Sequence, residues 1–225
     1  MNNKKQLPKK IGILGGSFDP VHLGHLDLAQ KILKSFHINK VIFVPNFKSP
    51  YSVQRKRLTS SKHRLKMLEL ALKFRDNLNV DNFEIQKGGI SYTLSTLKHF
   101  HRETHSLYFI TGIETFKTIS TWHRYKELFK LTHFVVVPRA SKTIPKPSHI
   151  LPQNFFEKNF KKLPHKTVWE HSSGHKIFYK KIKTLNISSS MIREKIKNKK
   201  NIVGLIPKEV YRYIEKTNLY QKKTS

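Results

Sequence analysis

The chain contains no cysteine, few acidic residues and no long apolar run. Its 225 residues include 44 Lys and Arg but only 14 Asp and Glu, which gives a formal net charge of +30. Without thiols there is no disulfide scaffold, thiolate metal site or cysteine nucleophile. No apolar run approaches the roughly 20 residues of a membrane span. The apolar stretch behind the basic N-terminus, 11–14, is too short for a signal-peptide core. We therefore expect a cytoplasmic protein that does not enter a membrane.

The excess of positive charge raises the question of a nucleic-acid partner. The chain has 35 Lys but 9 Arg, whereas Arg is the residue suited to bidentate contacts with bases and phosphates. The lysines are also spread along the whole chain in short clusters. We interpret them mainly as a solvated surface and expect no specific nucleic-acid partner.

Short apolar runs alternate with segments of helical periodicity. The strand-like runs are 11–14, 41–44, 80–85, 107–110, 134–137 and 177–181. Apolar residues recur at helical spacing within 26–36, 65–72, 94–100 and 128–131. This alternation predicts βαβ units, and hence an α/β fold with a Rossmann-like, doubly wound parallel sheet and helices on both faces. Such sheets bind ligands at the carboxyl ends of their strands.

A length of 225 residues fits one domain. We expect a single domain over 1–225, with a core at about 10–220 and basic tails at both ends. Residues 141–175 contain four prolines and little periodicity, which predicts an irregular excursion rather than a second domain. Oligomeric state does not follow from these features, and a homo-oligomer stays open.

The first strand-like run leads directly into 15–25, GGSFDPVHLGH. Gly15 and Gly16 lack Cβ atoms, so the backbone can turn tightly there and approach a phosphate closely. A helix that begins near His22 would present its N–H groups and its positive dipole end at the same place. The segment therefore combines a strand, a glycine turn and a helix N-terminus.

Two histidines follow this turn. His22 and His25 are three residues apart and share one helix face, and Gly24 between them would leave space for a ligand. The segment has neither the spacing of a dinucleotide-binding glycine motif nor the glutamate of a zinc-protease motif. We interpret it as a site for a polyphosphate.

A second anion-binding pattern lies near the C-terminus, at 187–193, ISSSMIR. Ser188, Ser189 and Ser190 are good N-cap residues and offer hydroxyl and N–H groups to an anion. Arg193, one turn into the predicted helix, can contact two phosphate oxygens at once.

Together these motifs resemble the H-x-G-H type of the nucleotidylyltransferase superfamily, and in particular the bacterial nicotinate-nucleotide adenylyltransferases. Further segments match that family in chain order: 45–46, 64–71, 91–97, 112–114, Trp122, 137–139 and 206–220. The resemblance covers about residues 10–220.

This resemblance implies adenylyl transfer from ATP to nicotinate mononucleotide, giving deamido-NAD and pyrophosphate, with Mg²⁺ as the cofactor. It implies that His22, His25 and Arg193 are catalytic, and it assigns no metal ligand to a protein side chain. The implied ATP site comprises Gly15, Gly16, Ser17, Phe18, Gly24, Gly112, Glu114, Ile187, Ser188, Ser189 and Ser190. The implied nicotinate-mononucleotide site comprises Asn46, Lys48, Tyr92, Thr93, Trp122 and Arg139.

Two departures from the family pattern bear on these assignments. Glu114 stands where the family usually has Asp, and 49–52 reads SPYS where the family typically has P-P-H-K. Trp122 taken alone fits a buried aromatic anchor equally well. Other acceptors for the same chemistry are nicotinamide mononucleotide, phosphopantetheine or a cytidylyl-transfer substrate. A more remote alternative is a basic nucleic-acid-binding protein on this fold.

Overall fold

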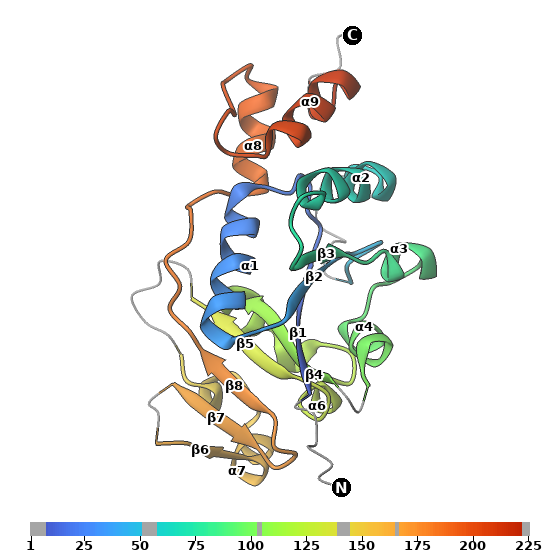
Figure 1. Ribbon diagram of the computed structural model, residues 1–225. Coiled ribbons are helices and arrows are strands. Elements are labelled where there is room, and N and C mark those ends of the chain that lie inside the picture. Colours follow the sequence, from blue (N-terminus) through green and yellow to red (C-terminus); the bar gives the residue numbers. More distant parts are fainter. Residues whose placement is uncertain (1–7, 51–57, 103–104, 139–144, 165–166, 222–225) are drawn as a thin grey trace, which may run out of the picture. The chain divides into compact units, whose positions relative to one another are not determined.

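The computed structural model describes residues 8–50, 58–102, 105–138, 145–164 and 167–221 (Figure 1). Its strands are β1 (Lys9–Gly16), β2 (Lys40–Pro45), β3 (Leu78–Val80), β4 (His105–Gly112), β5 (His133–Val137), β6 (Phe160–Lys162), β7 (Val168–His171) and β8 (Lys176–Tyr179). They form a sheet in the order β3-β2-β1-β4-β5-β8-β7-β6. The prediction of an α/β fold with a mostly parallel, Rossmann-like sheet is confirmed. The placement of helices on both faces stays a prediction.

Helices alternate with these strands along the chain. They are α1 (Leu23–Phe36), α2 (Ser61–Leu72), α3 (Phe83–Lys87), α4 (Thr93–Phe100), α5 (Ile113–Phe116), α6 (Tyr125–Leu128), α7 (Gln153–Asn159), α8 (Ser189–Lys197) and α9 (Lys208–Thr217), with 3₁₀ turns η1 (Ile119–Thr121) and η2 (Pro147–His149). Across the described residues, no helix has both the length and the apolar character needed to cross a bilayer.

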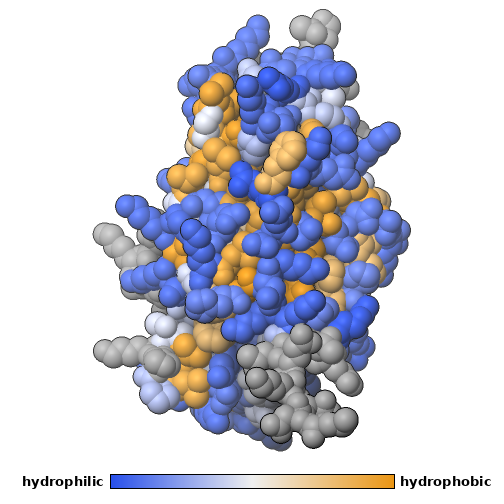
Figure 2. All heavy atoms as spheres, in the orientation of Figure 1, coloured by the Kyte–Doolittle hydropathy of each residue, from blue (hydrophilic) through white to orange (hydrophobic). Residues whose placement is uncertain are grey.

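The chain groups into two compact units. The first comprises Met1–Leu14, Leu33–Val41 and Tyr92–Lys183, and the second comprises Gly15–Ile32, Ile42–Ser91 and Thr184–Ser225. The prediction of a single domain stays a prediction. Hydrophilic residues cover most of the face shown in Figure 2, with apolar side chains between them, as a lysine-rich surface would give.

In the first unit, parallel pairing joins β1 to β4, β4 to β5 and β5 to β8. The far end departs from the parallel prediction, because β7 pairs antiparallel with both β8 and β6. Only a short turn, with Gly174 at a φ of +85°, joins β7 to β8. A parallel pair would need a crossover of a dozen or more residues.

Regular structure therefore occupies much of 141–175, where we expected an irregular excursion. Its described part holds η2, α7, β6 and β7. The four prolines suggested irregular structure. However, half-buried and buried residues alternate along β7 with the period of a strand.

The predicted strand 80–85 is also corrected. Strand β3 ends at Val80, and α3 begins at Phe83. The side chain of Asp81 accepts a hydrogen bond from the backbone N–H of Phe83 at 2.8 Å. Such an Asx turn offers the backbone an alternative to the strand ladder, although Val80 and Ile85 have strand-forming side chains.

The second unit has its own packed core. Phe18, Phe43, Met67 and Leu68 are buried there together with Val210 and Ile214 of α9. Helix α2 packs against α9, and the two lie side by side in Figure 1. Ser60 caps α2 by accepting a hydrogen bond from the N–H of His63.

His133 in β5 is a half-buried titratable group of the first unit. Its ring stacks on Tyr108 at 4.7 Å between centroids, and its Nδ1 accepts a hydrogen bond from the N–H of Lys176 at 3.0 Å. Burial, together with the positive charges of His175, Lys176 and Lys10, lowers the pKa of His133 from 6.5 to about 4. The neutral ring is therefore the form that fits the fold.

This pKa predicts acid destabilisation. Between about pH 6.5 and pH 4 the unfolded chain binds a proton at His133 that the folded chain does not. The free energy of unfolding should therefore be highest above pH 6.5 and fall as the pH drops through that window, by at most about 3 kcal/mol from this group. Urea unfolding at a series of pH values measures it.

His133→Asn is the matched variant for that measurement. The amide keeps an acceptor for the N–H of Lys176 but does not titrate. The variant should lose part of the acid dependence. An unchanged slope between pH 6.5 and pH 4 would contradict the assignment to His133.

Candidate active site

The turn after β1 lies at Phe18, beyond the two glycines. Strand β1 continues through Gly16, and neither Gly15 nor Gly16 is among the residues with positive φ. Phe18 carries the left-handed backbone instead, with a φ of +47°. The prediction that Gly15 and Gly16 make the tight turn is therefore wrong.

Gly16 is needed for a different reason, which is close approach. A Cβ atom at Gly16 would lie 3.2 Å from the ring of Phe18, tighter than most real Cβ contacts. The carbonyl of Gly16 accepts a hydrogen bond from the N–H of Asn46 at 2.9 Å. The missing side chain of Gly16 thus lets the ring of Phe18 lie against the backbone there. The carbonyl of Gly16 is bound by Asn46, in the segment after β2.

The side chain of Phe18 lies in the core. Its ring is 2% exposed and packs edge-on against His25, at 5.1 Å between centroids, and against Phe43 at 5.5 Å. The predicted ATP-binding residue Phe18 therefore supports the imidazole of His25 with its side chain. Any contact of Phe18 with ATP would come from its backbone.

His22 and His25 lie ring on ring, with 3.6 Å between centroids and 23° between planes. His22 is 2% exposed and His25 is half-buried. The backbone N–H of His22 donates to Nδ1 of His25 at 3.3 Å. Because Nδ1 of His25 acts as an acceptor, a neutral ring carries its proton on Nε2, the atom that can donate to a phosphate.

The N-terminus of α1 is less open than predicted. The N–H of His22 is used by His25, and the N–H of Leu23 donates to the carbonyl of Leu205 at 2.9 Å. Two of the N–H groups expected to face a phosphate thus have protein partners. The backbone donors available at this end of α1 are therefore fewer than predicted.

Gly24 leaves space for protein atoms. A Cβ atom there would lie 3.0 Å from Nδ1 of His22 and 3.2 Å from the carbonyl oxygen of Leu185. The prediction that Gly24 leaves space for a ligand therefore needs correction. Its missing side chain lets His22 and the segment before α8 approach the helix.

The two predicted phosphate clusters meet in the second unit. Ser189 Oγ donates to the carbonyl of Pro20 at 2.9 Å, and the guanidinium of Arg193 donates to the carbonyl of Asp19 at 2.6 Å. These bonds join the start of α8 to the loop that precedes His22. Residues about 170 positions apart in the sequence thereby form one polar cluster.

The serines at the start of α8 have distinct partners. Ser188 is the N-cap, as predicted, and its side chain accepts a hydrogen bond from the N–H of Met191 at 3.2 Å. Ser190 Oγ accepts a hydrogen bond from Arg193 at 3.3 Å. Ile187, predicted with them, is half-buried just before the cap, and its N–H donates to the carbonyl of Leu185 at 2.9 Å.

The segment after β2 carries two predicted acceptor residues. The carbonyl of Lys48 accepts a hydrogen bond from the N–H of Ser91 at 2.8 Å, and Ser91 Oγ accepts one from the N–H of Phe47 at 3.0 Å. Lys48 is exposed, and Asn46 is half-buried. Arg139, and Tyr51 and Ser52 of the altered loop, lie outside the described residues.

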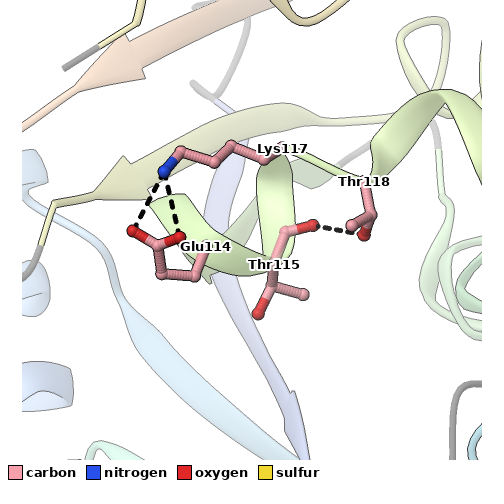
Figure 3. A network of polar contacts seen from close by, with 4 residues as sticks. All are labelled: Glu114, Thr115, Lys117 and Thr118. Atoms are coloured by element: carbon pink, nitrogen blue, oxygen red, sulfur yellow. Dashed lines mark hydrogen bonds and ion pairs between the residues drawn. The ribbon is translucent and has the colours of Figure 1, made fainter.

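In the first unit, Gly112 ends β4 and Glu114 lies in the first turn of α5. A Cβ atom at Gly112 would meet nothing within 4 Å. The carboxylate of Glu114 accepts hydrogen bonds from Nζ of Lys117 at 3.0 and 3.2 Å (Figure 3). A contact of Glu114 with a ribose would compete with this exposed ion pair.

Trp122 is buried beside the same helix. Its ring is 8% exposed and packs edge-on against Phe109 at 6.0 Å. The indole N–H donates to Thr118 Oγ1 at 3.2 Å, and that hydroxyl donates to the carbonyl of Thr115 at 2.9 Å, which Figure 3 shows. This geometry is that of an aromatic anchor, one of the two interpretations given above.

Tyr92 and Thr93 lie at the start of α4, with Tyr92 as its N-cap and Thr93 as its first residue. The ring of Tyr92 packs against His123 at 4.6 Å. His123 is exposed. Its contact with Tyr92 was not predicted from the sequence. The only available signal was its position next to Trp122.

Three further residues of the second unit were missed: Asp19, Arg64 and Tyr220. Asp19 is 2% exposed and Arg64 1%. Tyr220 donates its hydroxyl proton to Asp19 Oδ1 at 2.7 Å. All three fall in segments that match the family, but nothing in the sequence showed that they meet.

No group of three or more His, Asp or Glu side chains that could hold a metal ion occurs among the described residues. Asp19, the acid of the phosphate loop, has one oxygen bonded to Tyr220 and the other to the N–H of Thr59, at 3.3 Å. The donor set of this region therefore suits phosphate oxygens, with imidazole, hydroxyl and guanidinium groups.

Comparisons with known proteins identify the family of the chain. The profile of the cytidylyltransferase-like family matches residues 13–195. A protein of Desulfitobacterium hafniense (strain DSM 10664 / DCB-2) named "Probable nicotinate-nucleotide adenylyltransferase" is 38% identical over 220 residues, covering 95% of this chain and 97% of that protein. One of the same name in Clostridium botulinum (strain Alaska E43 / Type E3) is 34% identical over 214 residues, with 95% and 99% covered.

A solved structure is similar in fold. It is Plasmodium falciparum nicotinic acid mononucleotide adenylyltransferase complexed with NaAD, with a TM-score of 0.67 and 23% sequence identity. The alignment covers 94% of this chain and 97% of that chain. At this identity the likeness concerns the fold.

The close contacts of Gly24 yield a testable prediction. Gly24→Ala should push the ring of His22 or the carbonyl of Leu185 away from α1, because the new Cβ would lie 3.0–3.2 Å from them. Overpacking of this kind costs about 1–3 kcal/mol. Alanine also has a higher helix propensity than glycine, which stabilises α1. The change in melting temperature reports the sum of this gain and the cost of overpacking.

The measurement is turnover with ATP together with thermal unfolding. We expect the rate to fall about tenfold or more, as a displacement of His22 equivalent to 1.4 kcal/mol would give. Gln30→Ala, in the same helix and partly exposed, is the control. Equal rates for the two variants would show that the contact at Gly24 is unimportant.

Proposed function

The chain belongs to the nicotinate-nucleotide adenylyltransferase family, and from this premise we propose that it transfers the adenylyl group of ATP to nicotinate mononucleotide. The products are deamido-NAD and pyrophosphate, a step of NAD biosynthesis. Full-length similarity to curated relatives supports the assignment. The meeting of the two polar clusters at Asp19 and Pro20 is the structural observation that carries it.

The chemistry needs positioning rather than a covalent nucleophile. The attacking group is the 5′-phosphate of the mononucleotide, which is mostly ionised near neutral pH because its second pKa is about 6. It attacks the α-phosphorus of ATP in line with the departing pyrophosphate. The protein has to align the two phosphates and stabilise the charge on the equatorial and leaving oxygens.

We assign that work to the cluster in the second unit. The stacked imidazoles of His22 and His25 would donate to ATP phosphates, with Nε2 of His25 as the best-defined donor. Arg193 and the serines at the start of α8 would hold the β- and γ-phosphates. For this, Arg193 has to share its guanidinium between the carbonyl of Asp19 and the phosphate oxygens.

Mg²⁺ belongs to the proposal through the substrate. Mg²⁺ is commonly held by substrate phosphates and water with one or two carboxylates, and the described residues contain no dedicated cage for it. It would neutralise charge on the triphosphate when bound. His22, His25, Arg193 and the serines of α8 would bind the triphosphate together with this ion.

Further substrate contacts are proposed for each unit separately. Asn46 and Lys48 lie on the segment after β2, and Arg139 is the proposed partner of the mononucleotide phosphate. Tyr92 and Thr93 at the start of α4, together with Trp122, are proposed to shape the pocket for the nicotinate ring. Gly112 and Glu114 are proposed to lie near the ATP ribose. A cytoplasmic location stays a prediction.

The choice of acceptor is tested by pyrophosphate release with ATP and Mg²⁺. Nicotinate mononucleotide, nicotinamide mononucleotide and phosphopantetheine are offered separately, each at several concentrations. We expect the nicotinate compound to give the highest kcat/KM. Absence of product with both pyridine mononucleotides would contradict the proposed function, and a preference for the amide would correct the acceptor.

The phosphate role of His22 is tested by His22→Ala. Removing a preorganised donor to the transition state lowers kcat by about 10²–10³-fold. The substitution also removes the stacking partner of His25, so circular dichroism and the melting temperature are measured in parallel. A folded His22→Ala protein that turns over near the normal rate would show that the phosphate assignment is wrong.

A further inference from the structure

Arg64 is an ionised side chain inside the protein. It lies in the first turn of α2 and is 1% exposed. Its Nε donates to the carbonyl of Thr59 at 3.0 Å, which binds the guanidinium to the segment just before its own helix. Burial of an unpaired guanidinium would cost several kcal/mol, so the remaining donors also need partners.

Those partners belong to two different loops. One terminal nitrogen donates to the carbonyl of Ser17 at 2.8 Å and to Asn46 Oδ1 at 3.4 Å. The other terminal nitrogen donates to the carbonyl of Phe47 at 3.4 Å. Ser17 follows β1 in the loop assigned to ATP, whereas Asn46 and Phe47 follow β2 in the segment assigned to the acceptor.

A second set of hydrogen bonds, made by Asp19, holds the same loop. Asp19 is 2% exposed, and its negative charge is the main electrostatic effect that raises the pKa of Arg64 against the lowering by burial. Its carboxylate accepts hydrogen bonds from the N–H of Thr59 and from the hydroxyl of Tyr220. Thr59 therefore bonds to both buried charges, with its carbonyl to Arg64 and its N–H to Asp19.

Stability alone is a weak reason for this arrangement. Replacing buried ion pairs by apolar residues of similar volume is often neutral or stabilising, because the desolvation cost disappears. Apolar side chains at positions 64 and 19 together would avoid that cost. They would not fix the carbonyl of Ser17 with respect to the side chain of Asn46, which a planar guanidinium does with one nitrogen.

We propose that Arg64 is a positioning residue for adenylyl transfer: its guanidinium holds the ATP loop at Ser17 and the acceptor segment at Asn46 and Phe47 in a fixed relation. The inference rests on the proposed function. Arg64 touches neither substrate. It acts by setting the distance between the two loops on which the attacking phosphate and the α-phosphorus are aligned.

Arg64→Lys is the direct test. The ammonium keeps the charge but is a single point, so it cannot serve Thr59, Ser17, Asn46 and Phe47 together. We expect kcat to fall about 10- to 100-fold, because a displacement of about 1 Å at the reacting groups can cost 10²-fold. Rates are measured well below the melting temperature of each variant, so that loss of folded protein does not contribute.

Arg75→Lys is the matched control. Arg75 follows the end of α2, and its Nε donates to the carbonyl of Ala71 within the same helix at 3.3 Å. The substitution Arg75→Lys makes the same chemical change at a residue that binds neither the Ser17 loop nor the Asn46 segment. We expect kcat within about twofold of the unsubstituted protein, since surface changes of this kind cost about 0.5 kcal/mol or less.

A double-mutant cycle separates positioning from support of the fold. If Arg64 acts through Asn46, the losses in kcat/KM from Arg64→Lys and Asn46→Ala should be clearly less than additive. Purely additive losses would contradict the proposal. So would a folded Arg64→Lys protein with normal kcat, or a failure of both Arg64→Lys and Arg64→Gln to fold while Arg75→Lys folds.

Hydrogen exchange gives a readout that does not depend on activity. The N–H of Asn46 is bonded to Gly16, and that of Ser91 to Lys48. Both should exchange faster in Arg64→Lys and not in Arg75→Lys. If the unsubstituted protein makes no deamido-NAD, the proposed function falls. The exchange result then decides by itself whether Arg64 holds the two loops, and unchanged exchange overturns the inference.

Discussion

The second unit depends on the burial of two opposite charges, Arg64 and Asp19. Each is at most 2% exposed, so each must find hydrogen-bond partners inside the protein. The chain meets this demand with backbone groups, namely the carbonyl of Ser17 and both backbone polar groups of Thr59, and with one side chain, the hydroxyl of Tyr220. The loop after β1, the start of α2 and the segment after α9 are thereby held together around one polar centre.

The arrangement of the phosphate donors follows from this centre. The loop it fixes leads directly to His22 and His25, whose rings stack on each other, and the ring of His25 also packs edge-on against Phe18. The carbonyls of Asp19 and Pro20, at the end of the loop, receive the bonds from Arg193 and Ser189. A substrate triphosphate would therefore meet donors whose positions are set before it binds, which is what electrostatic catalysis by positioning requires.

Much of this was predictable from the sequence, because its signals are local. The apolar runs located most of the strands, and Ser60 and Ser188 were identifiable as caps before periodic segments. Local patterns failed where contacts between distant residues decide the structure. The missing side chain of Gly24 accommodates the ring of His22 and the carbonyl of Leu185. Asp19, Arg64 and Tyr220 meet across some 200 residues, and no spacing in the sequence reports that. At 80–85, a hydrogen bond from the N–H of Phe83 to the side chain of Asp81 outweighed strand propensity.

The central claim is that these groups align two phosphates for direct transfer, without a covalent enzyme intermediate. The steric course at the α-phosphorus tests it most directly, with ATP that carries a single sulfur of known configuration at that position. One in-line displacement inverts the configuration. We predict inversion in the dinucleotide product. Retention would require two displacements and therefore a nucleophile of the protein, and it would contradict the account.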